Sequence, residues 1–96
     1  MSQFIIIAQD YKDKEALNRR LAARPAHLER MKGEKAKGIF IIGGAKLNEA
    51  GKMFGSMLIV DLPDQETVNN WVSVDPYTTN NVWETVEITP FRIADV

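Results

Sequence analysis

The sequence of 96 residues contains no cysteine and a single histidine. Without thiols, the chain can form no disulfide, thiolate zinc site, iron–sulfur cluster or cysteine nucleophile. One histidine is too few for a histidine-rich metal centre. The phosphate-binding patterns G-x-G-x-x-G and G-x-x-x-x-G-K-[ST] are absent as well. We therefore expect a protein that works without a metal or a cofactor.

The sequence also has little that would predict contact with a membrane or a nucleic acid. No apolar run approaches the about 18 residues that indicate a membrane span. The start of the chain has no basic leader, and Asp10 soon follows the apolar residues 4–8, which argues against a signal peptide and for a cytoplasmic protein. The net charge of −1 and the lack of an aromatic pair on the predicted strands argue against nucleic-acid binding.

Length and composition predict one globular domain over residues 1–96. The mass of 10.8 kDa fits one domain, and the 45% of hydrophobic and 26% of charged residues are ordinary for a globular protein. A chain this short buries only about two thirds of the surface that its unfolded form exposes. Additional burial against a partner would therefore stabilise it.

Four runs rich in β-forming residues predict strands at Phe4–Ala8, Ile39–Ile42, Met57–Val60 and Val82–Ile93. A helix is predicted over Asp13–Lys37, with an apolar face of Leu17, Leu21, Leu28 and Met31. Pro25 lies inside this helix and should kink or restart it. A second helix follows Asp64, which can cap it, and stops before Pro76. The turn residues 48–51 predict a hairpin between the second and third strands.

The element order predicts an α+β protein with the ferredoxin-like βαββαβ topology. Right-handed crossovers place both helices on one face of a four-stranded antiparallel sheet. The first two strands supply apolar side chains to both faces, so the open face needs a cover. A second copy, packed sheet against sheet, is the simplest one. We therefore predict a homodimer through the open sheet face.

His27 is the first residue to consider for chemistry, because histidine is the residue type whose unperturbed side-chain pKa lies near neutral pH. Arg24 lies three residues earlier and projects from the same side of the helix. Asp75 precedes Pro76, where it can cap the following turn. It could also accept a hydrogen bond from His27 and fix the imidazole tautomer. Spacing alone favours the simpler interpretation, in which His27 is a half-buried structural histidine and Asp75 belongs to a helix stop.

Other features are less specific. Gly43-Gly44 and Gly55-Ser56 bracket the hairpin, where glycines allow a ligand to approach the backbone or form strand-end bulges. Ser56 has no base nearby in the sequence, and Trp71 and Trp83 are typical of a core or an interface. Residues 1–48 carry a net charge of +5 and residues 49–96 one of −6. Basic residues of the first helix could steer an anionic substrate or form a solvated surface: Arg19, Arg20, Arg24, Arg30, Lys32 and Lys35.

In this order, the motifs resemble the YciI-like (YCII-related) family over essentially the whole chain. They are Arg24-x-x-His27-Leu28, a glycine pair that ends a strand, Gly55-Ser56, Asp75-Pro76-Tyr77, and a last strand ending near Pro90-Phe91. The resemblance implies a ferredoxin-like protomer in a dimeric α+β barrel. It also implies a pocket in which His27 and Asp75 form an acid–base pair, with Arg24, Ser56 and Tyr77 as substrate-binding residues.

The chain departs from the family pattern at two points. Asn81 stands where a glycine is usual, and asparagine tolerates the left-handed backbone conformation better than most residues. The hairpin loop is short, which could leave the pocket more open. We further expect the two helices to run parallel, which would separate His27 from Asp75 by about 15 Å along the helix axis. Contact would then require a kink at Pro25 or an excursion of the Asp75 loop.

Two functions of different classes fit these observations. The first is a small cofactor-free enzyme, a lyase or isomerase, whose reaction could resemble the dehydrochlorination known in a relative of the family. His27 would be its acid–base group, and its substrate a small anionic or aromatic compound. The second is a non-catalytic ligand-binding or accessory protein, in which His27 and Asp75 form a structural hydrogen bond. A cofactor-free monooxygenase of the same fold is a weaker third reading.

Overall fold

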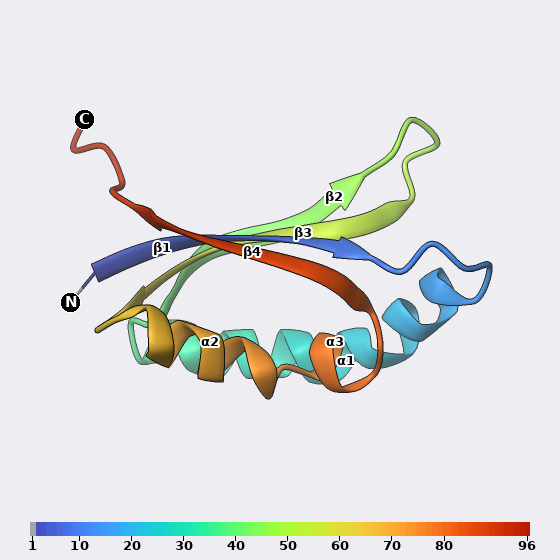
Figure 1. The fold of residues 1–96 in the computed structure, drawn as a ribbon, viewed down its shortest axis with the longest axis horizontal. Coiled ribbons are helices and arrows are strands. Elements are labelled where there is room, and N and C mark those ends of the chain that lie inside the picture. The colour runs from blue at the N-terminus through green and yellow to red at the C-terminus, as the bar shows by residue number, and fades with distance from the viewer. Residues whose placement is uncertain (1) are drawn as a thin grey trace.

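The computed structural model describes residues 2–96, which form a four-stranded sheet with all helices on one face (Figure 1). The sheet is antiparallel throughout, with the strand order β2-β3-β1-β4. This arrangement confirms the predicted ferredoxin-like α+β fold. The elements are β1 (Ser2–Asp10), α1 (Ala16–Ala36), β2 (Phe40–Leu47), β3 (Met53–Leu62), α2 (Gln65–Ser73), α3 (Pro76–Thr79) and β4 (Trp83–Phe91).

The central strand β1 separates the core from the open face of the sheet. Its residues Phe4, Ile6 and Ala8 are buried under the helices, whereas Ile5 and Ile7 point to the other face and are half-buried. The core continues from this inner face into α2, where Val68, Trp71 and Val72 are buried. The protomer leaves the outer face without a covering layer (Figure 1).

The β2–β3 hairpin is longer than predicted, because pairing continues past the apolar run of each strand. Gly43 and Gly44 therefore lie inside β2, and the register shifts fall elsewhere, near Phe40 and Leu47. A Cβ atom on Gly43 would lie 2.6 Å from the carbonyl oxygen of Met57. The glycine pair is thus neither a strand end nor a bulge, and Gly43 serves the close approach of β3.

The buried face of α1 differs from the predicted one. Leu21 and Leu28 are 49% and 45% exposed. The buried residues of the helix are instead Ala16, Arg20, Ala23, His27 and Met31, at the same helical spacing but in another register. Pro25 lies on the exposed side, and the helix continues through it without a break. No helix within residues 2–96 is both long and apolar enough to cross a bilayer.

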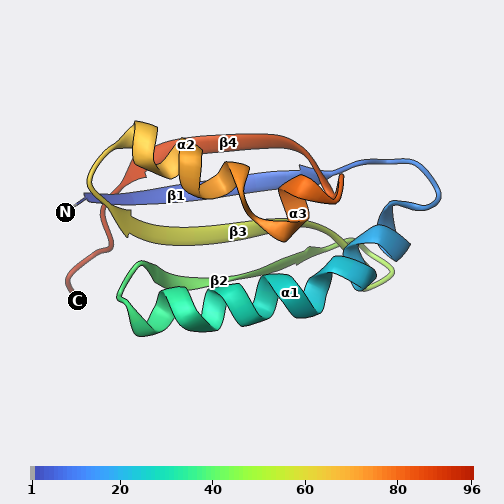
Figure 2. The same ribbon diagram turned by 90° about the horizontal axis from the view of Figure 1, so that it is seen from below.

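The two main helices run antiparallel, which corrects our expectation of parallel helices. Figure 2 shows α1 and α2 side by side on the sheet with opposite chain directions. The reason is topological: β1 and β3 are antiparallel neighbours, so the helices that follow them return in opposite directions. The last residues of α2 therefore lie beside the middle of α1, and no kink is needed to bring Asp75 near His27.

Local capping signals are confirmed in the segment around α2 and α3. Asp64 caps α2 by accepting a hydrogen bond from the backbone N–H of Thr67 at 2.8 Å. Asp75 caps α3 in the same way, through the N–H of Tyr77 at 2.9 Å. Asn81, which follows α3, has a φ of 55° in the left-handed region, as its replacement of a glycine predicts.

Candidate active site

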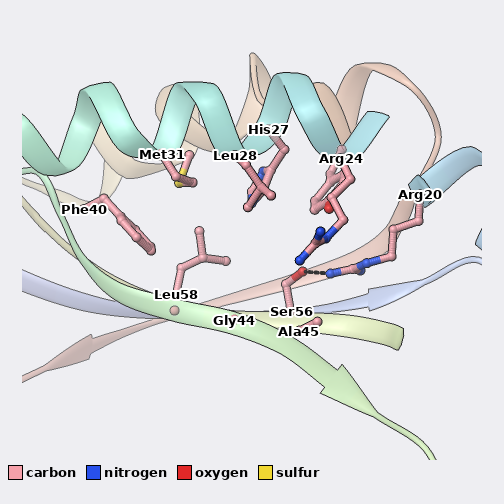
Figure 3. A pocket seen from close by; sticks show the side chains of 12 residues that line it. Arg20, Arg24, His27, Leu28, Met31, Phe40, Gly44, Ala45, Ser56 and Leu58 are labelled. Carbon is pink, nitrogen blue, oxygen red and sulfur yellow. Dashed lines mark hydrogen bonds between the residues drawn. The ribbon is translucent and has the colours of Figure 1, made fainter. Parts of the chain in front are cut away.

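A cavity of about 150 Å³ lies between α1 and the strands β2 and β3 (Figure 3). One end is apolar, with Met31, Phe40 and Leu58, and the other carries the polar side chains of Arg20, Arg24 and Ser56. The full lining comprises Arg20, Arg24, His27, Leu28, Met31, Phe40, Gly43, Gly44, Ala45, Ser56, Leu58 and Tyr77.

His27 and Asp75 are in direct contact at the wall of this cavity. The Nδ1 atom of His27 lies 2.8 and 3.1 Å from the two carboxylate oxygens of Asp75. Asp75 is completely buried, and His27 is 7% exposed. A carboxylate only accepts hydrogen bonds, so Nδ1 carries the proton, and the neutral imidazole has its lone pair on Nε2. Nε2 has no hydrogen-bond partner in residues 2–96. It is also not one of the side-chain nitrogen or oxygen atoms that are fully buried without a partner.

Asp75 is held in place by two further donors. The guanidinium of Arg30 donates to its second oxygen at 2.9 Å, and the backbone N–H of Tyr77 donates to the first. Arg30 also donates to the carbonyl oxygen of Trp71 at 2.8 Å, which ties α1 to α2. These bonds hold the carboxylate in the position from which it orients the imidazole.

Aromatic side chains enclose the imidazole. The Tyr77 ring stacks on His27 with ring centroids 4.0 Å apart, and the Trp83 ring meets the imidazole edge-on with centroids 5.9 Å apart. Burial raises the pKa of Tyr77 above its ordinary value of 10.0. The Tyr77 hydroxyl therefore stays protonated at neutral pH and has no hydrogen-bond partner within residues 2–96.

A second buried polar cluster lies beside the first. Arg20, only 2% exposed, donates from Nη1 to both oxygens of Asp10 at 2.9 Å and from Nη2 to the hydroxyl of Ser56 at 2.8 Å. The indole N–H of Trp83 donates to the same hydroxyl at 3.1 Å. Burial raises the pKa of Asp10 above its ordinary value, because removing the carboxylate from water outweighs its bonds to Arg20.

Arg24 is the exposed cation of the site. It lies one turn of α1 after Arg20 and forms no ion pair with any of residues 2–96. Figure 3 shows its side chain extending from α1 toward the strand that carries Ser56. An unpaired guanidinium at the polar end of a cavity is suited to an anionic oxygen.

Four of the five residues that the sequence singled out line this cavity: Arg24, His27, Ser56 and Tyr77. The fifth, Asp75, lies behind the wall and is bonded to His27. Sequence reasoning missed the partners that position them. Arg20 and Arg30 were assigned to a basic helix surface, yet Arg20 is buried and Arg30 is bonded to Asp75. The spacing of Arg20, His27 and Met31 along α1 is a signal that could have placed Arg20 on the buried side.

The site offers little to a metal ion. Within residues 2–96, no three side chains of histidine, cysteine, aspartate or glutamate gather closely enough to hold one. The donors around the cavity are instead cationic or neutral, as Arg20, Arg24 and Ser56 are, and such a set recognises an anionic oxygen.

Fold and cavity together define a ferredoxin-like α+β protein with a histidine–aspartate pair beside a small cavity. Comparison with known proteins places it more closely: the chain belongs to the YCII-related domain family, whose model matches residues 2–92. Protein YciI of Escherichia coli is 33% identical over 95 residues, which cover 93% of this chain and 95% of the relative.

Two solved structures illustrate the fold. The 5-chloro-2-hydroxyhydroquinone dehydrochlorinase of Burkholderia phenoliruptrix, in complex with 2,5-dihydroxybenzoquinone, has a TM-score of 0.81 at 24% identity, over 96% of this chain and 95% of that one. A dimeric ferredoxin-like protein of unknown function from Jannaschia has a TM-score of 0.55 at 9% identity, over 97% of this chain and all of that one. At these identities, the likeness describes the fold.

Proposed function

We propose that this protein is a cofactor-free enzyme in which His27 and Asp75 act as an acid–base pair on a small aromatic or anionic compound. One observation carries the proposal: Nδ1 of His27 is bonded to a buried carboxylate while Nε2 is left without a partner beside a cavity. In this arrangement Nε2 is a base, and Asp75 stabilises the imidazolium that forms when it takes a proton.

The cavity supports a substrate with one ring and an anionic oxygen. A volume of about 150 Å³ is that of an apolar cavity that binds benzene. Its apolar end, with Met31 and Leu58, would receive the ring, and Arg24 would pair with the anionic oxygen. Ser56 and Tyr77 complete the substrate-binding set as hydroxyl donors.

A single proton shuttle suffices for elimination or isomerisation. In an elimination, Nε2 takes a proton from the substrate, the released electron pair forms a double bond, and the leaving group departs with its own pair. In an isomerisation, the imidazolium returns the proton to another atom. General acid–base catalysis of this kind contributes about 10²–10⁴-fold in rate. Dehydrochlorination is the elimination that we favour, because a protein of the same fold carries it out.

Chloride release from 5-chloro-2-hydroxyhydroquinone tests this proposal. The wild type should release chloride, and His27→Asn, whose amide keeps an N–H donor for Asp75, should lose turnover by about 10²-fold or more. Leu21→Ala, on the exposed side of the same helix, is the matched control and should turn over normally. Absence of chloride release by the wild type would refute dehydrochlorination, and full turnover by His27→Asn would refute the role of His27.

The alternative is a binding or accessory protein in which the pair is structural. The enclosure of His27 by Tyr77 and Trp83 favours this reading, because a satisfied buried imidazole also stabilises a fold. In that case, His27→Ala should lower the melting temperature while leaving the affinity for 2,5-dihydroxybenzoquinone largely intact. Unchanged stability together with lost turnover would argue against it.

A homodimer through the open sheet face is part of the proposal. The cross-strand partners Ile5 and Ile59 share this face with Ile7 and Met57, and Ile42 is 58% exposed there. Burying such a face against a second copy gives the sheet-on-sheet layer that the protomer lacks. A protein with the same fold from Jannaschia is described as dimeric.

Sedimentation equilibrium tests the dimer. The wild type should sediment at twice the mass of one chain, and Ile42→Lys should sediment as a monomer, because it introduces a charge into the proposed interface. Leu21→Lys is the matched control, since this residue is similarly exposed but lies on α1 at the opposite side of the sheet. A monomeric wild type, or dissociation by the control alone, would contradict the proposed interface.

A further inference from the structure

The hydroxyl oxygen of Ser56 accepts two hydrogen bonds, which limits where its own hydrogen can point. Its oxygen accepts from Arg20 Nη2 at 2.8 Å and from the indole N–H of Trp83 at 3.1 Å. A serine oxygen has two lone pairs and one hydrogen. Both acceptor positions are therefore filled, and the hydroxyl hydrogen must point in the one direction that remains.

No acceptor within residues 2–96 receives this hydrogen. Ser73, on α2, shows the usual case: its hydroxyl donates to the carbonyl oxygen of Asn70 at 2.7 Å. Ser56 makes no such donation, although it is buried and lines the cavity. A buried donor without an acceptor is costly, unless a ligand supplies the acceptor.

We propose that Ser56 is a dedicated hydrogen-bond donor to an anionic oxygen of the ligand, and that Arg20 is the positioning residue that makes it one. This inference rests on the proposed function and adds a specificity element to the same cavity. It also assigns Ser56 a role other than nucleophile. An attacking oxygen needs a free lone pair and a base to take its proton, and both lone pairs of this oxygen are engaged by donors.

Arg20 keeps the Ser56 hydroxyl in the orientation in which it can donate to a ligand. Its guanidinium is anchored by Asp10, so the fork of donors keeps a fixed direction toward Ser56. A cation that donates to a hydroxyl oxygen draws electron density from it and strengthens the hydroxyl as a donor. The cavity should therefore select ligands that present an acceptor oxygen, such as a phenolate, enolate or carboxylate, and reject those that present only donors.

Calorimetric titration with 2,5-dihydroxybenzoquinone tests the donor role. Ser56→Ala should weaken binding by on the order of 10-fold to 100-fold, the effect of losing one hydrogen bond to a charged group. Ser73→Ala is the matched control and should bind as the wild type does. 2,5-Dimethyl-1,4-benzoquinone, in which methyl groups replace the acidic hydroxyls, should bind weakly to all variants and should discriminate little between them.

Two measurements that need no ligand also test the donor role of Ser56. The indole N–H of Trp83 should exchange slowly with solvent in the wild type and faster in Ser56→Ala, as followed by NMR. Phenylmethanesulfonyl fluoride should add no mass to Ser56 in the intact protein. If Ser56→Ala does not fold, Ser56→Cys replaces it, because a thiol remains a weak acceptor for Arg20 and Trp83 but is a poor donor.

The outcomes separate this inference from the proposed function. A wild type that does not bind 2,5-dihydroxybenzoquinone would remove the ligand class on which both rest. Equal affinity of the wild type and Ser56→Ala would overturn the donor role alone. Unchanged exchange of the Trp83 indole, or a sulfonyl adduct on Ser56, would overturn it even if dehydrochlorination is observed.

Discussion

The two buried carboxylates of this protein, Asp10 and Asp75, are used in different ways. Each is bonded to a cationic or protonatable side chain from the buried stripe of α1, and that side chain lines the cavity. Asp10 is paired with Arg20, and a guanidinium keeps its proton under all ordinary conditions. Asp75 is shared by Arg30 and His27, and the imidazole has a second nitrogen that reaches the cavity.

The comparison teaches how one helix can hold both a fixed and a reactive ionic group. In the Asp10 cluster the carboxylate is paired with a guanidinium that keeps its proton, so the cluster is suited to orient Ser56 rather than to transfer protons. In the Asp75 cluster, Arg30 and the Tyr77 N–H hold the carboxylate, which leaves the imidazole free to take up a proton at Nε2. The predictions below test this division of roles.

The largest effect should follow from Asp75→Asn. An amide cannot accept from His27, Arg30 and the Tyr77 N–H through two equivalent oxygens, so the imidazole loses the acceptor that fixes its tautomer. In the serine-protease triad the same exchange lowers kcat by about 10⁴-fold, and we expect a loss of this order in chloride release. Turnover close to that of the wild type would mean that Asp75 serves only as the cap of α3.

Arg20→Ala should have the largest effect on stability. It leaves Asp10 buried without a partner and should lower the free energy of unfolding by about 3–5 kcal/mol, as measured by urea denaturation. Arg19→Ala is the control, because it breaks the ion pair to the exposed Asp13, and its effect should be far smaller. Similar losses for the two variants would show that the Asp10 cluster is not the fixed ionic group of the comparison.

Much of the fold follows from local patterns in the sequence. The apolar runs predict all four strands, and Asp64, Asp75 and Asn81 carry capping and turn signals that the structure confirms. The antiparallel order of β1 and β3 already implies antiparallel helices, so our expectation of parallel helices was an error of topology. With that corrected, the contact between His27 and Asp75 follows without distortion of α1.

The register of α1 was less predictable. A pattern of hydrophobicity assigns leucines to the core and arginines to solvent, but in this helix Arg20 and His27 are buried while Leu21 and Leu28 are exposed. The polar residues are tolerated because Asp10 and Asp75, on other elements, satisfy them. Such pairs are 10 and 48 residues apart in the chain, and only the fold brings them together.

Arg30→Gln should have an intermediate effect. Glutamine can still donate one hydrogen bond, but the charge that stabilises the ionised carboxylate of Asp75 is lost. We expect chloride release to fall by about 10-fold, as for the loss of roughly 1.4 kcal/mol, with the dimer intact. Lys32→Gln, on the exposed side of the same helix, is the control. An unchanged rate of chloride release would show that Asp75 supports His27 without the charge of Arg30.

The smallest effect concerns the outer end of the Asp75 cluster, which continues through Arg30 and Trp71 to Glu34. Burial alone would raise the pKa of Glu34, but its bonds from Trp71 and Lys37 lower it below the ordinary value of 4.5. A carboxyl whose pKa is lower in the folded state stabilises the fold above the unfolded pKa and loses this contribution as the pH falls through the folded pKa. At pH 7 the wild type should therefore be more stable than Glu34→Gln by less than about 1 kcal/mol. This difference in the free energy of unfolding should vanish well below pH 4.5. Urea denaturation at several pH values across this range measures it. A difference that persists in acid would mean that packing against Trp71, and not charge, is what Glu34 contributes.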